Sequence, residues 1–218
     1  MVKFLAISSS PVKKGNGEYL TAHMLKTAKE LGCDTQGFNL SEMEIKECLH
    51  CNACIKKQKP EEYCVLNDDA QTIFKAAEQS DIILLSSPVY HMRMHVRMAT
   101  LADRMRVFIF GKLSSGKMKN KVGISAAVAW KRHGGLETTH LSHMYVFYNL
   151  DMLPVGCHHS ISPLGASALS SRHGEGQFEK DIRLGVMEDE AGLKSGEMIV
   201  KRAIEVVNAL KGETSTIV

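Results

Sequence analysis

Four cysteines lie close together in the first third of the chain. Cys48, Cys51, Cys54 and Cys64 follow the spacing C-x2-C-x2-C-x9-C. Two-residue spacings allow one turn of chain to present several thiolates to a common centre, and three close cysteines are typical of iron–sulfur ligation. Zinc sites more often pair two C-x2-C units that lie a dozen or more residues apart. The spacing therefore favours a [4Fe–4S] cluster, with zinc and free redox-active thiols as the alternatives.

The other two cysteines, Cys33 and Cys157, stand alone in the sequence. A lone cysteine among apolar neighbours is most often a small buried hydrophobic residue, and we expect this of both. Cys157 is the alternative fourth ligand if Cys64 does not serve. We assign none of the ten histidines to the metal site, because isolated histidines are usually surface groups or hydrogen-bonding core residues.

A polar loop follows the first apolar run and leads directly into a helical pattern. It reads SSSPVKKGNGE from Ser8 to Glu18. Small hydroxyl residues and glycines let backbone N–H groups point inward, and a helix N-terminus adds partial positive charge, so the loop suits a phosphate. The Walker and dinucleotide glycine patterns are absent, which favours a monophosphate, while an ordinary turn is the simpler alternative. The residues expected to contact this ligand are Ser8, Ser10, Lys13, Asn16, Gly17 and Glu18.

Two later stretches also follow predicted strands and suit the edge of a flat ring. The first combines a rigid proline with an aromatic residue, and the second contains a tryptophan and paired glycines that permit close backbone approach. Taken singly, such a tyrosine is more often a half-exposed boundary residue than a ligand contact, and such a methionine more often fills the core. The expected ligand contacts are Pro88, Val89, Tyr90, His91 and Met92 in the first stretch and Ala129, Trp130, Gly134 and Gly135 in the second.

Strands and helices that would position these residues alternate along the chain. Apolar runs predict buried strands, and repeats of apolar residues at three to four positions predict helices between them. Such alternation indicates an α/β fold with right-handed crossovers and a parallel sheet that carries helices on both faces. The predicted strands are 2–8, 35–39, 81–86, 122–129 and 152–155, and the last helix is predicted over 190–210.

Composition and charge limit the classes of function. The net charge is +3 and the basic residues are scattered, so we expect no nucleic-acid partner. The apolar run in residues 1–10 is too short for a signal peptide or a membrane span. We therefore expect a cytoplasmic protein with reduced thiols. Residues 157–185 are rich in serine, histidine and glycine, so we expect a long functional or assembly loop there.

The three ligand stretches occur in an order and spacing that resemble those of a known family. Residues 1–154 are similar to the NAD(P)H-dependent FMN reductase and iron–sulfur flavoprotein family, which implies FMN as the resident ligand. Two departures are Val12, where the family usually has arginine, and Gly17, where it has threonine or serine. A third is the gap before Cys64, which is longer than in iron–sulfur flavoproteins.

This resemblance implies a flavodoxin-like doubly wound sandwich with a five-stranded parallel sheet in the order 2-1-3-4-5. The chain would form one FMN-binding domain over 1–218, with the cysteine loop at 47–66 and an extension from about 157. The implied function is an FMN-dependent oxidoreductase that passes electrons between ferredoxin or NAD(P)H and a small acceptor through the cluster, as a homodimer or homotetramer. The alternatives are an electron carrier or redox sensor without turnover, and a zinc-stabilised binding module. No catalytic acid or base is identified.

Overall fold

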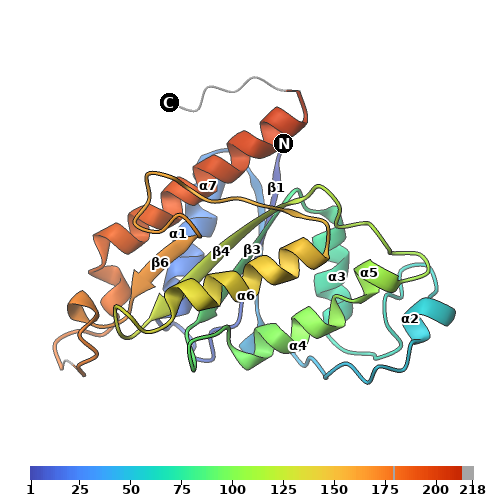
Figure 1. Ribbon diagram of the computed structural model, residues 1–218, viewed down its shortest axis with the longest axis horizontal. Helices are drawn as coiled ribbons and strands as arrows, with labels where there is room; N and C mark the ends of the chain where they lie inside the picture. Colours follow the sequence, from blue (N-terminus) through green and yellow to red (C-terminus); the bar gives the residue numbers. More distant parts are fainter. Residues whose placement is uncertain (179, 213–218) are drawn as a thin grey trace.

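The carboxyl ends of the parallel strands meet at one edge of a twisted sheet. A computed structural model describes residues 1–178 and 180–212, and Figure 1 shows the sheet at its centre. The strand order β2-β1-β3-β4-β5 confirms the prediction. The strands are β1 (Lys3–Ser8), β2 (Asp34–Asn39), β3 (Ile82–Pro88), β4 (Val122–Ala129), β5 (Leu153–Pro154) and β6 (Ala166–Leu169).

The strand β6 is an addition to the five predicted strands. β4 pairs with β5 over its first two residues and with β6 over Ala126–Ala129, so two short strands share one edge. The stretch 157–185, expected to be a loop, thus contributes to the sheet. Three of its four strand residues, Ala166, Ser167 and Ala168, are small and carry little strand preference, so pairing with β4 and not local propensity places them there.

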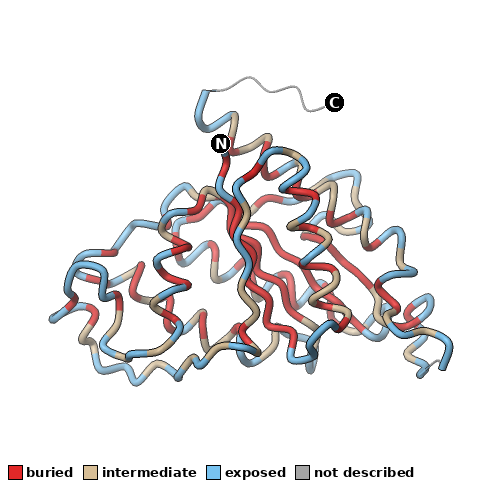
Figure 2. The backbone as a smooth tube through the Cα atoms, turned by 180° about the vertical axis from the view of Figure 1, so that it is seen from behind, coloured by how far each residue is buried: buried red, intermediate tan, exposed pale blue. Residues whose placement is uncertain are grey.

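Helices cover both faces of the sheet, as the alternating pattern predicted. α1 (Asn16–Glu30) and α7 (Glu190–Leu210) pack on one face, and α3 (Ala70–Gln79), α4 (Val96–Arg104), α5 (Val107–Phe110) and α6 (Leu136–Asn149) pack on the other. Figure 2 shows the central strands buried and the outer sides of the helices exposed. Each face therefore has its own apolar core, with the sheet between them.

The last helix, α7, has the predicted bounds. Asp189 caps it by accepting a hydrogen bond from the N–H of Gly192 at 3.0 Å, which satisfies one of the free donors of the first turn. Its buried positions recur every three to four residues and face α1 and the sheet. Within residues 1–178 and 180–212, no helix is long and apolar enough to cross a bilayer.

Two helices, α4 and α5, follow each other closely along residues 96–110. The N–H of Met105 bonds to the carbonyl oxygens of both Leu101 and Ala102, a mixed pattern that tightens the end of a helix. The chain then restarts as α5, so that Arg104 and Arg106 both lie beside the cysteine loop. That loop holds α2 (Ala53–Lys56), and the short helices η1 (Leu40–Glu42), η2 (Arg172–Gly174) and η3 (Gly185–Met187) complete the elements.

Candidate functional site

All four predicted cluster cysteines line one small cavity between the cysteine loop and the α4–α5 junction. The cavity is bounded on the helix side by Arg104, Arg106 and Val107. Cys54 is buried, Cys48 and Cys64 are half-buried and Cys51 is exposed. Figure 1 shows α2 at the far end of the molecule from β6. The fold thus gathers the four thiols although Cys64 is separated from the others by a nine-residue insertion.

The backbone of the cysteine loop bends sharply between the thiols. His50 and Asn52, which alternate with the cysteines, both have left-handed φ angles, at 50° and 59°. Such angles are strained for residues other than glycine and are found where a site demands them. The amide oxygen of Asn52 accepts a hydrogen bond from Arg106 at 3.0 Å, which fixes the bend. The strain is therefore held in place by the same arginine that borders the cavity.

Arg106 gives this cavity a positive charge that suits thiolate ligands, whereas the charge of Arg104 is balanced by Asp68. Burial raises the pKa of the Cys54 thiol, and the positive charge of Arg106 acts against that rise. The buried Nε of Arg104 has no hydrogen-bond partner among the described residues. An unpaired buried donor is costly unless an acceptor comes to it, and the sulfur atoms of a cluster are acceptors. The residues present therefore fit an anionic iron–sulfur cluster.

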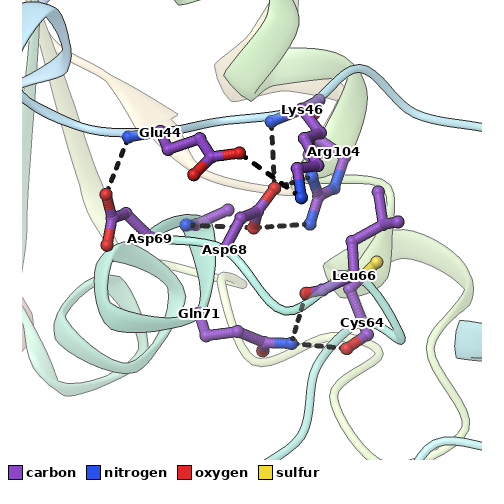
Figure 3. Close-up of polar contacts among 9 residues, drawn as sticks. Glu44, Lys46, Cys64, Leu66, Asp68, Asp69, Gln71 and Arg104 are labelled. Carbon is purple, nitrogen blue, oxygen red and sulfur yellow. Dashed lines mark hydrogen bonds and ion pairs between the residues drawn. The ribbon is translucent and has the colours of Figure 1, made fainter.

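The guanidinium of Arg104 is fixed by a fully buried ion pair with Asp68, shown in Figure 3. Its Nη1 donates to Asp68 Oδ2 at 2.7 Å and its Nη2 donates to Oδ1 at 3.1 Å. Nη1 also donates to the carbonyl oxygen of Lys46 at 2.8 Å, and the N–H of Lys46 donates to Asp68 at 2.9 Å. The pair thereby ties together α4 and the two chain segments that enter and leave the cysteine loop.

The far side of the loop is anchored by Gln71 on α3. Its side-chain amide donates to the carbonyl oxygens of Cys64 and Leu66, and its oxygen accepts from the N–H of Tyr63 at 3.0 Å. Figure 3 shows the contacts of Gln71 with Cys64 and Leu66 beside the Arg104–Asp68 pair. The position of Cys64 is therefore set by α3, which explains how the fourth thiol reaches the cavity after a long insertion.

The remaining cysteines lie elsewhere. Cys33 and Cys157 both pack with the core on the α1 and α7 face, whereas Cys54 and Cys64 pack with the core on the opposite face. Burial raises the pKa of the Cys33 thiol to about 11, as expected for an inert core residue. The sheet separates Cys157 from the cavity. Among the residues that the structure describes, no three histidine, cysteine, aspartate or glutamate side chains converge as ligands of a single metal ion.

The predicted phosphate loop ends at a helix terminus that no side chain caps. Gly15 is the N-cap of α1 and has no side chain to offer, so the first-turn N–H groups point to the loop. Ser8 and Ser10 are buried, and the hydroxyl of Ser8 accepts a hydrogen bond from the N–H of Ser10 at 3.3 Å. Ser10 also lies against Gly17, where an added Cβ would come within 3.2 Å. A tight loop thus surrounds free helix donors, as an anion would require.

Three further side chains predicted in this loop, those of Lys13, Asn16 and Glu18, also have partners within the chain. Lys13 forms an exposed ion pair with Glu42 at 3.0 Å, and the oxygen of Asn16 accepts a hydrogen bond from Val186 at 3.0 Å. Glu18 accepts from the side chain of Asn39 at 2.8 Å and from the N–H of Lys14. These side chains order the loop, and their contacts with a phosphate stay predictions.

The second predicted stretch forms a tight turn whose two central residues are left-handed. Tyr90 and Arg93 exchange backbone hydrogen bonds at 3.2 Å, and His91 and Met92 have φ angles of 50° and 59°. This geometry normally selects glycine or asparagine, so the turn is strained. Val89 continues the sheet by donating to the carbonyl oxygen of Val128 at 2.8 Å. The turn therefore projects its side chains from the end of β3.

The third stretch, after β4, packs directly on that turn. Gly135 has a φ of 108°, and a Cβ there would lie 2.5 Å from the Cα of Met92. Thr138 holds the turn by donating to the carbonyl oxygen of Met92. Trp130 is half-exposed beside Phe178, with ring centroids 4.7 Å apart. The structure thus brings the second and third stretches together at the carboxyl edge of the sheet, next to the loop after β1.

Replacement of Gly135 by alanine tests this contact. Gly135→Ala should lower the free energy of unfolding by about 1–3 kcal/mol, since the positive φ is strained and the new methyl group meets the backbone of Met92. Gly116→Ala is the matched control, because Gly116 also has a positive φ but no atom within 4 Å of its added Cβ. Urea unfolding and FMN titration of both variants check the prediction. Equal FMN affinities in the two variants would contradict a ligand contact at Gly135.

Arg104 and Arg106 are site residues that the sequence did not reveal. They lie some fifty residues beyond the first three cysteines, outside every stretch predicted to bind a ligand. Charged residues in a helix are usually solvated, and no local signal distinguishes one that turns inward. Only the pairing of Arg104 with Asp68 and of Arg106 with Asn52 identifies them.

Comparison with known proteins gives a family match and similar folds. The sequence profile of the NADPH-dependent FMN reductase family matches residues 2–165. An iron–sulfur flavoprotein of Methanocaldococcus jannaschii is 30% identical over 96% of this chain and 100% of its own length. An iron–sulfur flavoprotein of Archaeoglobus fulgidus is 26% identical over 95% of this chain and 98% of its own length.

A solved structure shares the fold at low sequence identity. The flavodoxin-like WrbA-like protein of Agrobacterium tumefaciens superposes with a TM-score of 0.60 at 13% identity, over 94% of this chain and 99% of that one. Its likeness concerns the fold alone. Together with the strand order, it confirms the flavodoxin-like architecture expected from the sequence.

Proposed function

Since this chain belongs to the NADPH-dependent FMN reductase family, we propose that it is an FMN-dependent oxidoreductase that also carries a [4Fe–4S] cluster. FMN would lie at the carboxyl edge of β1, β3 and β4, and the cluster would be held by Cys48, Cys51, Cys54 and Cys64. The observation that carries the cluster is the single cavity lined by all four thiols and by two arginines. Relatives named iron–sulfur flavoproteins support it.

The residues at the carboxyl edge would position the flavin and tune it. The N–H groups at the start of α1 would bind its phosphate, and the strained turn at residues 90–93 would present backbone amides and the Tyr90 and Met92 side chains to its ring. When bound, FMN exchanges two electrons with one partner and single electrons with another. The protein supplies binding, orientation and access, because no acid or base side chain is identified at this edge.

The proposed partners follow from the same assignment. NAD(P)H or ferredoxin would supply electrons, and a small molecule would accept them. We further propose a single domain over 1–218, a cytoplasmic location in keeping with free thiols, and a homodimer or homotetramer, which light scattering would establish. The rival functions are an electron carrier or sensor without turnover and a zinc-stabilised binding module.

The visible spectrum of protein purified without oxygen tests the cofactors. We expect flavin absorption together with broad iron–sulfur absorption, and equal amounts of FMN and cluster by flavin, iron and sulfide assays. A colourless protein that contains zinc would instead select the binding module. If the protein is coloured, the enzyme hypothesis predicts continuous oxidation of NAD(P)H or reduced ferredoxin when a small acceptor is added. A single reduction without turnover, with every donor, would select the electron carrier.

A further inference from the structure

A continuous chain of polar side chains crosses the sheet beneath α6, through an otherwise apolar core. Serine hydroxyls alternate with the rings of His140 and His143, and every member is at least 95% buried. The five contacts in order are Ser9–Ser87 at 2.8 Å, Ser87–His143 at 3.0 Å, His143–Ser125 at 2.7 Å, Ser125–His140 at 2.7 Å and His140–Ser167 at 2.9 Å. This track of six side chains (Ser9, Ser87, His143, Ser125, His140 and Ser167) thus runs from the end of β1 past β3 and β4 to β6.

Each member of this track can donate one proton and accept one. A serine hydroxyl does both, and a neutral imidazole has one N–H and one bare nitrogen. If Ser167 donates to His140, each later group donates onward and Ser9 donates to the carbonyl oxygen of Ser86 at 3.3 Å. In the reverse orientation every bond turns round, and Ser167 donates to the carbonyl oxygen of Gly165 at 3.5 Å. Both orientations leave every hydroxyl and every ring N–H satisfied.

Burial keeps both imidazoles neutral, as this arrangement needs. It lowers the pKa of His140 to about 4, and it lowers the pKa of His143 to about 3 with a further contribution from His140. The track therefore holds no net charge that would fix its protons in one orientation. Six polar groups in a core are costly compared with apolar residues of similar size, so a purely structural role would not favour them.

The two ends of the track reach different parts of the molecule. Ser167 lines a cavity of about 500 Å³ between the loop after β4 and the start of α7, where His133, Glu137 and Glu188 also lie. At the other end, Ser9 and Ser87 directly adjoin Ser10 and Pro88, which belong to two of the predicted flavin stretches. These six side chains therefore lead from this cavity to the carboxyl edge of the sheet, where FMN is proposed to bind.

We propose that Ser9, Ser87, His143, Ser125, His140 and Ser167 form a proton wire between that cavity and the carboxyl edge of the sheet. One proton enters at Ser167, each hydrogen bond passes one proton onward, and one proton leaves from the Ser9 end to an acceptor bound at the carboxyl edge. No electron moves along the wire. After one proton has passed, every hydrogen bond in the wire points the other way. The passage of one proton from Ser9 back to Ser167 restores the first orientation. This inference rests on the proposed FMN function, since flavin chemistry takes up and releases protons in turn.

The tautomers of the two histidines test the wire without reference to activity. In full-length protein labelled with ¹⁵N-histidine, both nitrogens of His140 and of His143 should show shifts averaged between protonated and bare nitrogen. In Ser125→Ala the rings lose their shared hydroxyl, and each should settle with its proton on Nε2, facing Ser167 or Ser87. One fixed tautomer for each ring in the wild-type protein would overturn the proposal. This measurement does not need FMN, so it separates failure of the wire from failure of the proposed function.

A kinetic comparison tests the transfer itself. With FMN bound, Ser125→Ala should slow proton-coupled flavin oxidation by about tenfold or more, with FMN affinity unchanged and with a smaller solvent deuterium isotope effect. Ser86→Ala is the matched control, because Ser86 is equally buried but faces the opposite side of the sheet, where it contacts Thr21 at 2.8 Å. It should lose stability without a change in isotope effect. Equal rates and isotope effects in the two variants would refute the wire.

Discussion

Replacement of Asp68 by alanine should lower the free energy of unfolding by about 3–5 kcal/mol, because it leaves the buried Arg104 guanidinium without its counter-ion. The side chains are 0% and 1% exposed, so water cannot solvate the charge that remains. The same substitution removes the acceptor for the N–H of Lys46, just before the first cluster cysteine. Urea unfolding without oxygen measures the loss, and iron analysis should show weaker retention of the cluster.

Two further variants separate the ion pair from its surroundings. Asp69→Ala is the matched control, since Asp69 is exposed and accepts a hydrogen bond from the N–H of Glu44 at 2.7 Å, and its loss should cost about 1 kcal/mol. The double variant Asp68→Leu with Arg104→Met should recover most of the stability, because it removes both charges. It should not recover the iron if Arg104 contacts the cluster. Equal losses in Asp68→Ala and Asp69→Ala would contradict the role of the buried pair.

The stabilisation from Asp68 should also depend on pH. Burial raises the pKa of this carboxyl, but the hydrogen bonds from Arg104 and Lys46 outweigh burial and hold the pKa below its ordinary value. The folded state therefore binds this proton less readily than the unfolded state, in which the pKa of the carboxyl is about 4. The contribution is complete above that pH and is lost as the pH falls through the folded pKa. The stability gap between wild type and Asp68→Ala should narrow in acid.

Replacement of Cys51 by alanine should remove nearly all of the cluster iron and leave FMN bound. A [4Fe–4S] cluster needs a thiolate at each iron, and no spare cysteine lies on this face of the sheet within the described residues. Cys51 is exposed, so its loss should disturb packing little. Iron, sulfide and flavin assays, with the visible spectrum, measure the outcome. Loss of FMN together with iron would contradict two separate sites.

Two control variants show whether the effect belongs to the cavity. Cys33→Ala and Cys157→Ala remove thiols on the opposite face of the sheet and should keep the iron. Cys64→Ala should behave like Cys51→Ala, because Cys64 lines the same cavity. Iron retained in Cys64→Ala but lost in Cys157→Ala would reverse the assignment of the fourth ligand.

The amino-acid sequence was sufficient to establish the layered α/β fold and the spacing of the cysteines. These depend on local patterns: apolar runs make buried strands, three-to-four repeats make helices, and two-residue spacings place thiols on one turn. It did not determine β6, whose small residues become a strand only because β4 offers unpaired backbone groups beside them.

The tertiary structure alone decided which distant polar residues meet. Arg104 finds Asp68 across 36 positions, and Ser9 finds Ser87 across 78, so neither contact leaves a periodic trace in the sequence. The pairing of neighbouring strands and the packing of α6 on the sheet set these contacts. A buried polar side chain is costly without a hydrogen-bond partner. Which partner it has depends on how the strands and helices pack, and local propensity does not determine it.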